Sequence, residues 1–225
     1  MVTTAIEPAA ADFRRNRLLQ GLAVAYGLWW LVLALAPYDR FDWFLENLLV
    51  FAFVGLLAVT YRRFPLSDLS YLLIAVFLAL HALGAHYTYS EAPVGRWLTD
   101  LFGGQRNHYD RVVHFLFGLL CAYPLRETVL RGAGVGGWRA GLLAYAVVLA
   151  FSSAYEMLEW AAVLVLSPEE GMAFLGTQGD VFDAQKDTAL AAAGGALALL
   201  LAPLAERGAR LRAARRRPAR SDSAP

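Results

Sequence analysis

Hydrophobic residues gather in six long runs that are separated by short polar segments. Each run comes near the roughly 20 apolar residues that cross a bilayer as a helix. None shows the period-two alternation of a transmembrane barrel, whereas helices pair their own backbone groups within lipid. We therefore predict an all-α, polytopic membrane protein with six transmembrane helices in one bundle. The predicted spans are residues 18–36, 44–61, 69–87, 109–125, 140–166 and 188–204.

A shorter apolar pattern lies just before the fourth run. Five apolar residues recur there at spacings of three and four, which predicts a short interfacial helix at about 92–102. They are Val94, Trp97, Leu98, Leu101 and Phe102. The turn at Gly103 and Gly104 is expected to end this helix.

Composition agrees with the membrane class. The 225-residue chain is 58% hydrophobic and 17% charged, with a mean hydropathy of +0.45. Its single cysteine, Cys121, lies within an apolar run. One cysteine excludes an intramolecular disulfide and any metal site made of several cysteines.

The arginines alternate from one side of the predicted bundle to the other. They are concentrated before the first run, after the second, between the fourth and fifth, and in the tail. By the positive-inside rule these segments, including both termini, are cytoplasmic. The start lacks the pattern of a cleaved signal peptide, so the first run is expected to stay as an anchor.

Three segments follow from this topology. We expect a cytoplasmic N-terminal segment (1–17), a six-helix transmembrane domain (18–205) and a basic cytoplasmic tail (206–225). Besides the lipid bilayer around the bundle, the arginine-rich tail is expected to contact anionic lipid. No motif or aromatic interleaving in it indicates a nucleic acid, and protein partners stay unknown.

Polar and ionisable residues gather at one depth of the predicted bundle. His81 and His86 lie in the outer half of the third span, and Glu156 and Glu159 lie one turn apart on the fifth, with Ser152 one turn earlier. The fourth span opens with a second set, and the loop before the sixth carries a third. These residues are Asp110, Arg111 and His114, followed by Gln178, Asp180, Asp183, Lys186 and Asp187. The assigned topology places all of them in the outer half of the membrane or next to it.

Glu156 and Glu159 are the hardest of these to explain as structure. A charge at the bilayer centre costs about 2.5–3.5 kcal/mol on insertion scales. Two ionised carboxylates one turn apart also repel each other, so either one is protonated or a cation lies between them. That cation could be Arg111, Lys186, protonated His114 or a metal, and a purely structural ion-pair network is the alternative.

Several other residues have a structural explanation beside a functional one. Asp180 could be the N-cap of the sixth helix with Asp183 at N3, and His81 could be a hydrogen-bonded packing residue. The GTQG run (176–179) could be a tight turn, or it could present backbone N–H groups to an anion. Asp187 is in register with a stripe of alanine and glycine, so we expect it to point into the bundle.

Five sequence blocks carry a resemblance to a known family. They are HYTY (86–89), RNHYDRVVHFLFG (106–118), AYPLRE (122–127), SSAYEMLEW (152–160) and LGTQGDVFDAQKD (175–187). Over about 44–195 the chain resembles the YjdF-type bacterial inner-membrane proteins, with Phe182 where a tryptophan is expected. The resemblance implies a multi-pass fold in the bacterial inner (plasma) membrane and brings no established substrate or catalytic residue. A looser pattern is similar to VanZ-like membrane proteins, which pair a histidine on one helix with a glutamate and a later aspartate-rich helix start.

Three functions fit this pattern. The first is an enzyme with an outward-facing His/carboxylate site, acting on a lipid-linked or envelope substrate with a divalent metal ion as cofactor. The second is a small proton-coupled transporter, and the third is a non-catalytic scaffold or resistance factor. No HExxH signature is present, and the sequence names neither the substrate nor the metal.

Each candidate residue has a predicted role in the first hypothesis. The predicted catalytic residues are Glu156, Glu159, His114 and Asp187. The predicted substrate-binding residues are His86, Arg111, Gln178 and Lys186. The predicted metal ligands are His114, Glu156, Glu159, Asp110 and Asp183. Mixed imidazole and carboxylate ligands suit zinc, manganese or iron, and oxygen-rich sets suit magnesium or calcium.

Overall fold

The apolar runs form helices in the computed structural model. The structure describes residues 12–102 and 104–216, and within these ranges it does not describe the side chains of residues 102, 168–169, 173 and 203–216. No strand occurs in this described part of the chain. The helices are a short 3₁₀ turn η1 (Phe13–Arg15), α1 (Arg17–Leu35), α2 (Arg40–Thr60), α3 (Asp68–His86), α4 (Pro93–Phe102), α5 (Tyr109–Gly132), α6 (Trp138–Val165), α7 (Pro168–Leu175) and α8 (Asp183–Arg216).

Five helices are long and apolar enough to cross a membrane. In the described part of the chain they are α1, α2, α3, α5 and α6, and by length and composition they match five of the six predicted spans. The sixth predicted span lies within α8, which is not among the five, so a sixth crossing stays a prediction. Helix α8 also continues to Arg216, and thus takes in the first half of the predicted tail, whereas 217–225 lie outside the described residues.

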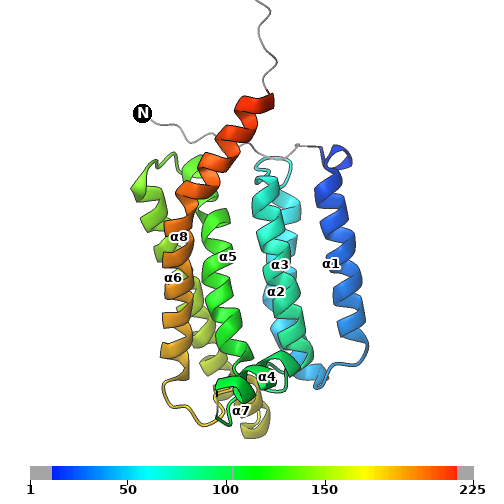
Figure 1. Cartoon of the computed structure of the whole chain (residues 1–225). Coiled ribbons are helices and arrows are strands. Elements are labelled where there is room, and N and C mark those ends of the chain that lie inside the picture. The colour runs from blue at the N-terminus through cyan, green and yellow to red at the C-terminus, as the bar shows by residue number, and fades with distance from the viewer. Residues whose placement is uncertain (1–11, 103, 217–225) are drawn as a thin grey trace, which may run out of the picture.

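The long helices run side by side, and α5 is central among them (Figure 1). Helix α5 packs against α3, α6 and α8, whereas α1 packs on the far side of α3. The first residues of α1 and the last turns of α8 lie at one end of the bundle, and α4 and α7 lie at the other (Figure 1). We call these the terminal end and the loop end.

Helices α5 and α8 approach so closely that only glycine fits between them. A Cβ atom on Gly118 would lie 1.9 Å from the carbonyl oxygen of Ala191, and one on Gly194 would lie 2.0 Å from that of Phe115. Small residues allow such backbone contact between helices in a membrane. The predicted stripe on α8 therefore faces α5, and Asp187, two turns before Gly194, is buried with 2% of its surface exposed.

Two short helices close the loop end. Helix α4 matches the predicted interfacial helix at 92–102. Helix α7 was not predicted, although its start has a clear signature: the Ser167 side chain accepts from the Glu170 backbone and Glu170 reaches back to Ser167. This reciprocal capping box holds the first turn of α7 against the end of α6.

The terminal end contains a carboxylate that is fully enclosed by donors. Glu127 on α5 has no exposed surface. It accepts hydrogen bonds from the Ser67 backbone N–H and hydroxyl at 2.8 and 2.7 Å, and from the Ser70 hydroxyl at 2.5 Å. Arg131 lies one turn away with its Nη1 2.5 Å from Glu127 Oε1. This closed network joins α5 to the first turn of α3.

Candidate functional site

The start of α5 is built to hold charged residues at the loop end. Asn107 accepts a hydrogen bond from the Tyr109 backbone N–H at 3.0 Å and donates to the Ala92 carbonyl at 2.9 Å. Gln178, in the loop before α8, pairs with the backbone of Asn107 through both ends of its amide. This loop is thereby tied to the start of α5, which brings Arg106 and Asp110 next to the start of α8.

Three carboxylates converge where α5 meets α8. One oxygen from each of Asp110, Asp183 and Asp187 lies within 4.8 Å of the others. Asp183 and Asp187 are 6% and 2% exposed. Oδ1 of Asp187 has no hydrogen-bond partner, and no described basic side chain forms an ion pair with Asp187. We call these three residues the aspartate triad.

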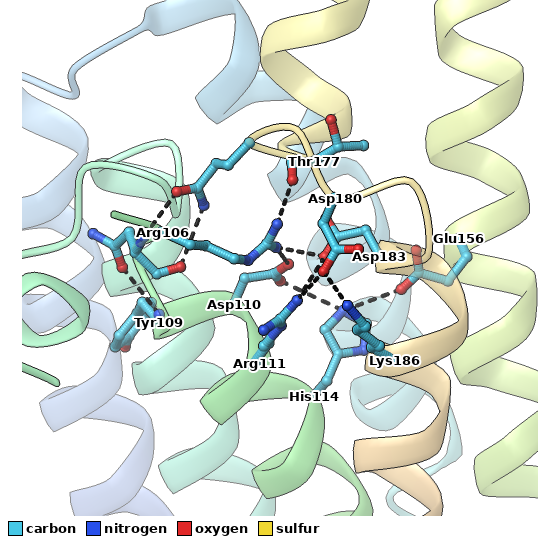
Figure 2. A network of polar contacts seen from close by, with 12 residues as sticks. Arg106, Tyr109, Asp110, Arg111, His114, Glu156, Thr177, Asp180, Asp183 and Lys186 are labelled. Carbon is cyan, nitrogen blue, oxygen red and sulfur yellow. Dashed lines mark hydrogen bonds and ion pairs between the residues drawn. The ribbon is translucent and has the colours of Figure 1, made fainter. Parts of the chain in front are cut away.

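Two arginines and a lysine lie beside the carboxylates of Asp110, Asp180 and Asp183 (Figure 2). Arg106 Nη2 lies 2.6 Å from Asp183 Oδ1 and 3.7 Å from Asp110 Oδ2, and its Nη1 donates to the Thr177 carbonyl. Arg111 Nη2 and Lys186 Nζ both reach Asp180 Oδ2, at 2.5 and 2.6 Å. The described basic groups therefore pair with Asp110, Asp180 and Asp183 and leave Asp187 without a basic partner.

His114 joins the triad to α6. Its Nε2 lies 3.5 Å from Asp110 Oδ1 and 3.3 Å from Glu156 Oε1, and its Nδ1 lies 3.5 Å from the Ser152 hydroxyl (Figure 2). Both carboxylates face the same ring nitrogen, so an N–H at Nε2 can donate to either of them, and an unprotonated Nε2 can accept a proton from either.

Glu159 lies on the other side of the cluster. It is close enough to Asp110, Glu156 and Asp187 for their charges to act on it. It also lines a void of about 10 Å³ together with Glu46 and Asp110. That volume is about the minimum for one water molecule. The predicted Glu156/Glu159 pair thus belongs to a group of six carboxylates, whose other members are Asp180 and the three residues of the triad. Three described permanently basic side chains face this group: Arg106, Arg111 and Lys186.

A second buried polar chain runs from this void into α2 and α3. Glu46 accepts a hydrogen bond from the Tyr155 hydroxyl at 2.6 Å. His81 places Nε2 3.1 Å from the Glu46 carbonyl oxygen and Nδ1 2.5 Å from the Tyr89 hydroxyl. Both ring nitrogens of His81 are therefore engaged, which agrees with its interpretation as a packing residue.

His86 does not join the cluster. Its Nδ1 lies 2.7 Å from the carbonyl oxygen of Leu33 on α1. Helix α1 is at the opposite side of the bundle from α6 and α8 (Figure 1). The structure brings together the other predicted site residues, although Gln178 holds backbone rather than a free ligand-binding position.

The capping interpretation of Asp180 is wrong in position. Helix α8 begins at Asp183, and the Lys186 N–H bonds to the Phe182 carbonyl at 3.0 Å, so Phe182 occupies the N-cap position. Asp180 Oδ1 instead accepts from the Phe182 N–H in the preceding turn. The GTQG run is a tight turn, with left-handed backbone at Gly176, Gln178 and Gly179.

Titration of the loop residues follows their neighbours. The Lys186 ammonium, helped by the Phe182 N–H and the Arg111 guanidinium, lowers the pKa of Asp180 to about 2. Burial, with the charges of Arg111 and Arg106, lowers the pKa of His108. Burial raises the pKa of Tyr89 well above its usual range. In the neutral range Asp180 is therefore ionised, whereas His108 and Tyr89 are neutral.

Sequence reasoning missed Arg106 and Glu46 as parts of the site. A signal existed for Arg106, because it is one of few arginines in the predicted outer loops, and basic residues are depleted there. Glu46 lies near the start of a predicted span and is 4% exposed. A carboxylate within a span indicates a functional or paired group, and the sequence could not supply its partner Tyr155.

These features define a multi-helix membrane protein with a buried acidic cluster at one end of its bundle. The chain belongs to the family described as "Predicted membrane protein (DUF2238)", whose family model matches residues 18–207. It is similar to the inner membrane protein YjdF of Escherichia coli (strain K12), with 39% identity over 154 residues, which are 68% of this chain and 73% of that protein. The family resemblance drawn from the five sequence blocks is thereby confirmed. No solved structure matches the chain.

Proposed function

We propose that the acidic cluster binds a divalent metal ion and that the protein is a metal-dependent enzyme acting on a lipid-linked or envelope substrate. The observation that carries the proposal is the aspartate triad, with its buried and unpartnered Asp187 oxygen. A buried carboxylate without a partner is costly, and a bound cation removes that cost. The excess of carboxylates over basic groups in the cluster points the same way.

The donor set favours a hard ion. Oxygens on opposite sides of one ion are separated by about 4.0–4.2 Å for magnesium and about 4.6–5.2 Å for calcium. The triad oxygens all lie within 4.8 Å of one another, which is close enough for one calcium, magnesium or manganese ion to contact all three. All three donors are oxygens, which argues against zinc as the first choice.

The neighbouring residues have distinct roles in this proposal. A divalent ion would make a bound water more acidic and polarise a phosphoryl or carbonyl oxygen. His114, between Asp110 and Glu156, is the general base or acid. Arg106 and Arg111 neutralise the Asp183 and Asp180 carboxylates beside the ion.

Metal analysis of the purified full-length protein tests this proposal. Elemental analysis should find about one magnesium, manganese or calcium ion per chain, and Mn²⁺ titrated into chelator-treated protein should bind one to one. The variant Asp187→Asn should lose this ion, whereas Asp100→Asn, at an exposed carboxylate on α4, should keep it. A folded wild type with clearly less than one ion per chain would end the proposal.

We further propose that the loop end faces outward, as the positive-inside rule predicts. A background variant Cys121→Ser removes the native thiol. In that background an impermeant maleimide should label Asp100→Cys in intact spheroplasts, but should label Arg62→Cys only after lysis. The reverse pattern would place the cluster on the cytoplasmic side.

Proton-coupled transport is the second candidate, and the water-sized void favours it. Four carboxylates, Asp42, Glu46, Asp110 and Glu159, line this void and could exchange a proton through one water molecule. All of them lie at the loop end, however, and the described contacts do not continue this chain to Glu127 at the terminal end. An enzyme or binding site at one end explains the cluster better than a relay across the bundle.

A further inference from the structure

A groove opens beside the acidic cluster, on its α6 side. It has a volume of about 490 Å³ and lies between the last part of α6, the loop after α7 and the first turn of α8. Glu156 and Asp183 line its inner part, and Met157, Trp160 and Val181 line its outer part. The groove therefore joins the metal site proposed above to the surface of the bundle.

The outer part of the groove is apolar and exposed. Met157 and Trp160, on α6, are 64% and 58% exposed, and Val181, in the loop before α8, is 84% exposed. Helix α6 is apolar enough to cross a membrane, exposed apolar side chains on a spanning helix contact acyl chains, and tryptophan is enriched at the level of the headgroups. An amphiphile could therefore enter the groove sideways from the membrane and keep its chains in lipid.

The inner part of the groove is acidic. Its described charged residues are Glu156, Asp180 and Asp183, and none of the residues that line it is basic. Asp180 and Asp183 pair with Lys186, Arg111 and Arg106, whereas Glu156 has no described permanently basic partner, and its polar neighbours are the His114 ring, 3.3 Å away, and Glu159. Oε1 of Glu156 also has no hydrogen-bond partner. The groove thus offers one buried acceptor to a cationic group.

We propose that the groove admits a membrane phospholipid with a primary amine in its headgroup, such as phosphatidylethanolamine, with the ammonium group at Glu156. This lipid is then the substrate class of the enzyme, an assignment that rests on the proposed function. Its phosphate, next to the amine along the headgroup, would lie beside Asp183 and the metal site. Charge complementarity with the carboxylates disfavours a purely anionic headgroup such as phosphatidylglycerol.

Photo-crosslinking in nanodiscs tests the groove. The full-length protein is placed in phosphatidylcholine nanodiscs with a trace of phosphatidylethanolamine or phosphatidylglycerol, each with a diazirine in one acyl chain. The amine lipid should label the groove at Met157, Trp160 or Val181, about tenfold more strongly than the anionic lipid, which corresponds to about 1.4 kcal/mol of preference. Equal labelling by both probes, or labelling spread evenly over the apolar surface of α1 and α2, would overturn the proposal.

Groove-filling variants sharpen this test. Ala184 and Gln185 line the groove on α8, so Ala184→Trp and Gln185→Trp should each reduce labelling of the groove by the amine lipid about tenfold. The control Ala193→Trp adds the same ring at an exposed position on α8 away from the groove and should leave labelling unchanged. Two filling variants keep the test usable if one of them fails to fold. If neither filling variant reduces labelling by the amine lipid, the proposal that a lipid occupies the groove is refuted.

The same samples separate this proposal from the metal proposal. Labelling is measured after chelation and again with one equivalent of Mn²⁺. If the protein binds no Mn²⁺ but selective labelling persists after chelation, lipid binding in the groove is supported and the metal site is refuted. If Mn²⁺ binds one to one but the filling variants do not reduce labelling, the metal site is supported and lipid binding in the groove is refuted.

Discussion

Glu127 and Asp187 are both buried carboxylates on long helices, yet their surroundings are opposite. Glu127, at the terminal end, accepts from the backbone and hydroxyl of Ser67 and the hydroxyl of Ser70, and it pairs with Arg131. Asp187, at the loop end, is 2% exposed, has one oxygen without a hydrogen bond and has no described basic partner. One group is complete within the chain, and the other is not.

This difference separates structure from function in a chain where both look alike in the sequence. A buried charge whose donors all come from the protein stabilises the contact between helices, and removing it leaves those donors unpaired. A buried charge without donors is a cost that folding alone does not explain. We therefore infer that Glu127 stabilises the architecture, and the contrast supports the proposal that the aspartate triad binds a ligand.

The largest effect is expected from Glu127→Ala. This variant leaves the Ser67 N–H without its acceptor and leaves Arg131 with only the Pro65 carbonyl, and breaking such a buried pair costs about 3–5 kcal/mol. For a chain of this size the melting temperature should fall by about 6–20 °C. Thermal unfolding in detergent measures this, with Asp100→Asn as the control. A fall no larger than the control's would show that the Glu127 network is not structural.

The variant Asp187→Asn should behave in the opposite way. It replaces a buried carboxyl group that has no described basic partner by a neutral amide of the same shape, so the metal-free protein should be as stable as the wild type or more stable. Its affinity for Mn²⁺ should fall by about 100-fold, or about 2.7 kcal/mol. Isothermal titration and melting curves with and without metal measure both quantities. Loss of stability without any change in metal binding would make Asp187 a structural residue like Glu127.

A smaller effect should follow from Gly194→Ala. The added Cβ would lie 2.0 Å from the Phe115 carbonyl oxygen, so α8 must move away from α5. Overpacking of this kind costs about 1–3 kcal/mol. Because the triad spans both helices, Mn²⁺ affinity should fall as well, whereas Glu127, on α5 against α3, should be unaffected.

The control for this variant is Gly55→Ala on α2, where the added Cβ meets nothing within 4 Å. There alanine should be neutral or slightly stabilising, by up to about 1 kcal/mol. Unchanged metal affinity in Gly194→Ala would show that close packing of α5 and α8 does not set the geometry of the triad.

The spans could be predicted from the sequence because the bilayer sets their length. The polar residues could be placed at one end of the bundle because the arginines indicate the side of the membrane on which each loop lies. Depth alone does not give direction around the bundle. His86 was placed at the right level, yet it faces α1, whereas Arg106 was overlooked and contacts the triad. Direction could be inferred only for Asp187, where the small residues of α8 reveal which side meets α5.

Asp180 lies between the two extremes of the comparison, and its substitution should have the smallest effect. It has basic partners, as Glu127 does, but on the exposed side of the cluster, where an ion pair contributes little.

The pKa of Asp180 is lowered from 3.8 to about 2, chiefly by Lys186, so its ionised form favours the folded state. That contribution is complete above about pH 4 and is lost as the pH falls through about 2. Both pKa values lie below pH 5, so the difference in melting temperature between Asp180→Asn and the wild type should stay constant from pH 5 to pH 8. A difference that varies within that range would mean that Asp180 shares protons with the triad, and the outer ion pairs would then belong to the site.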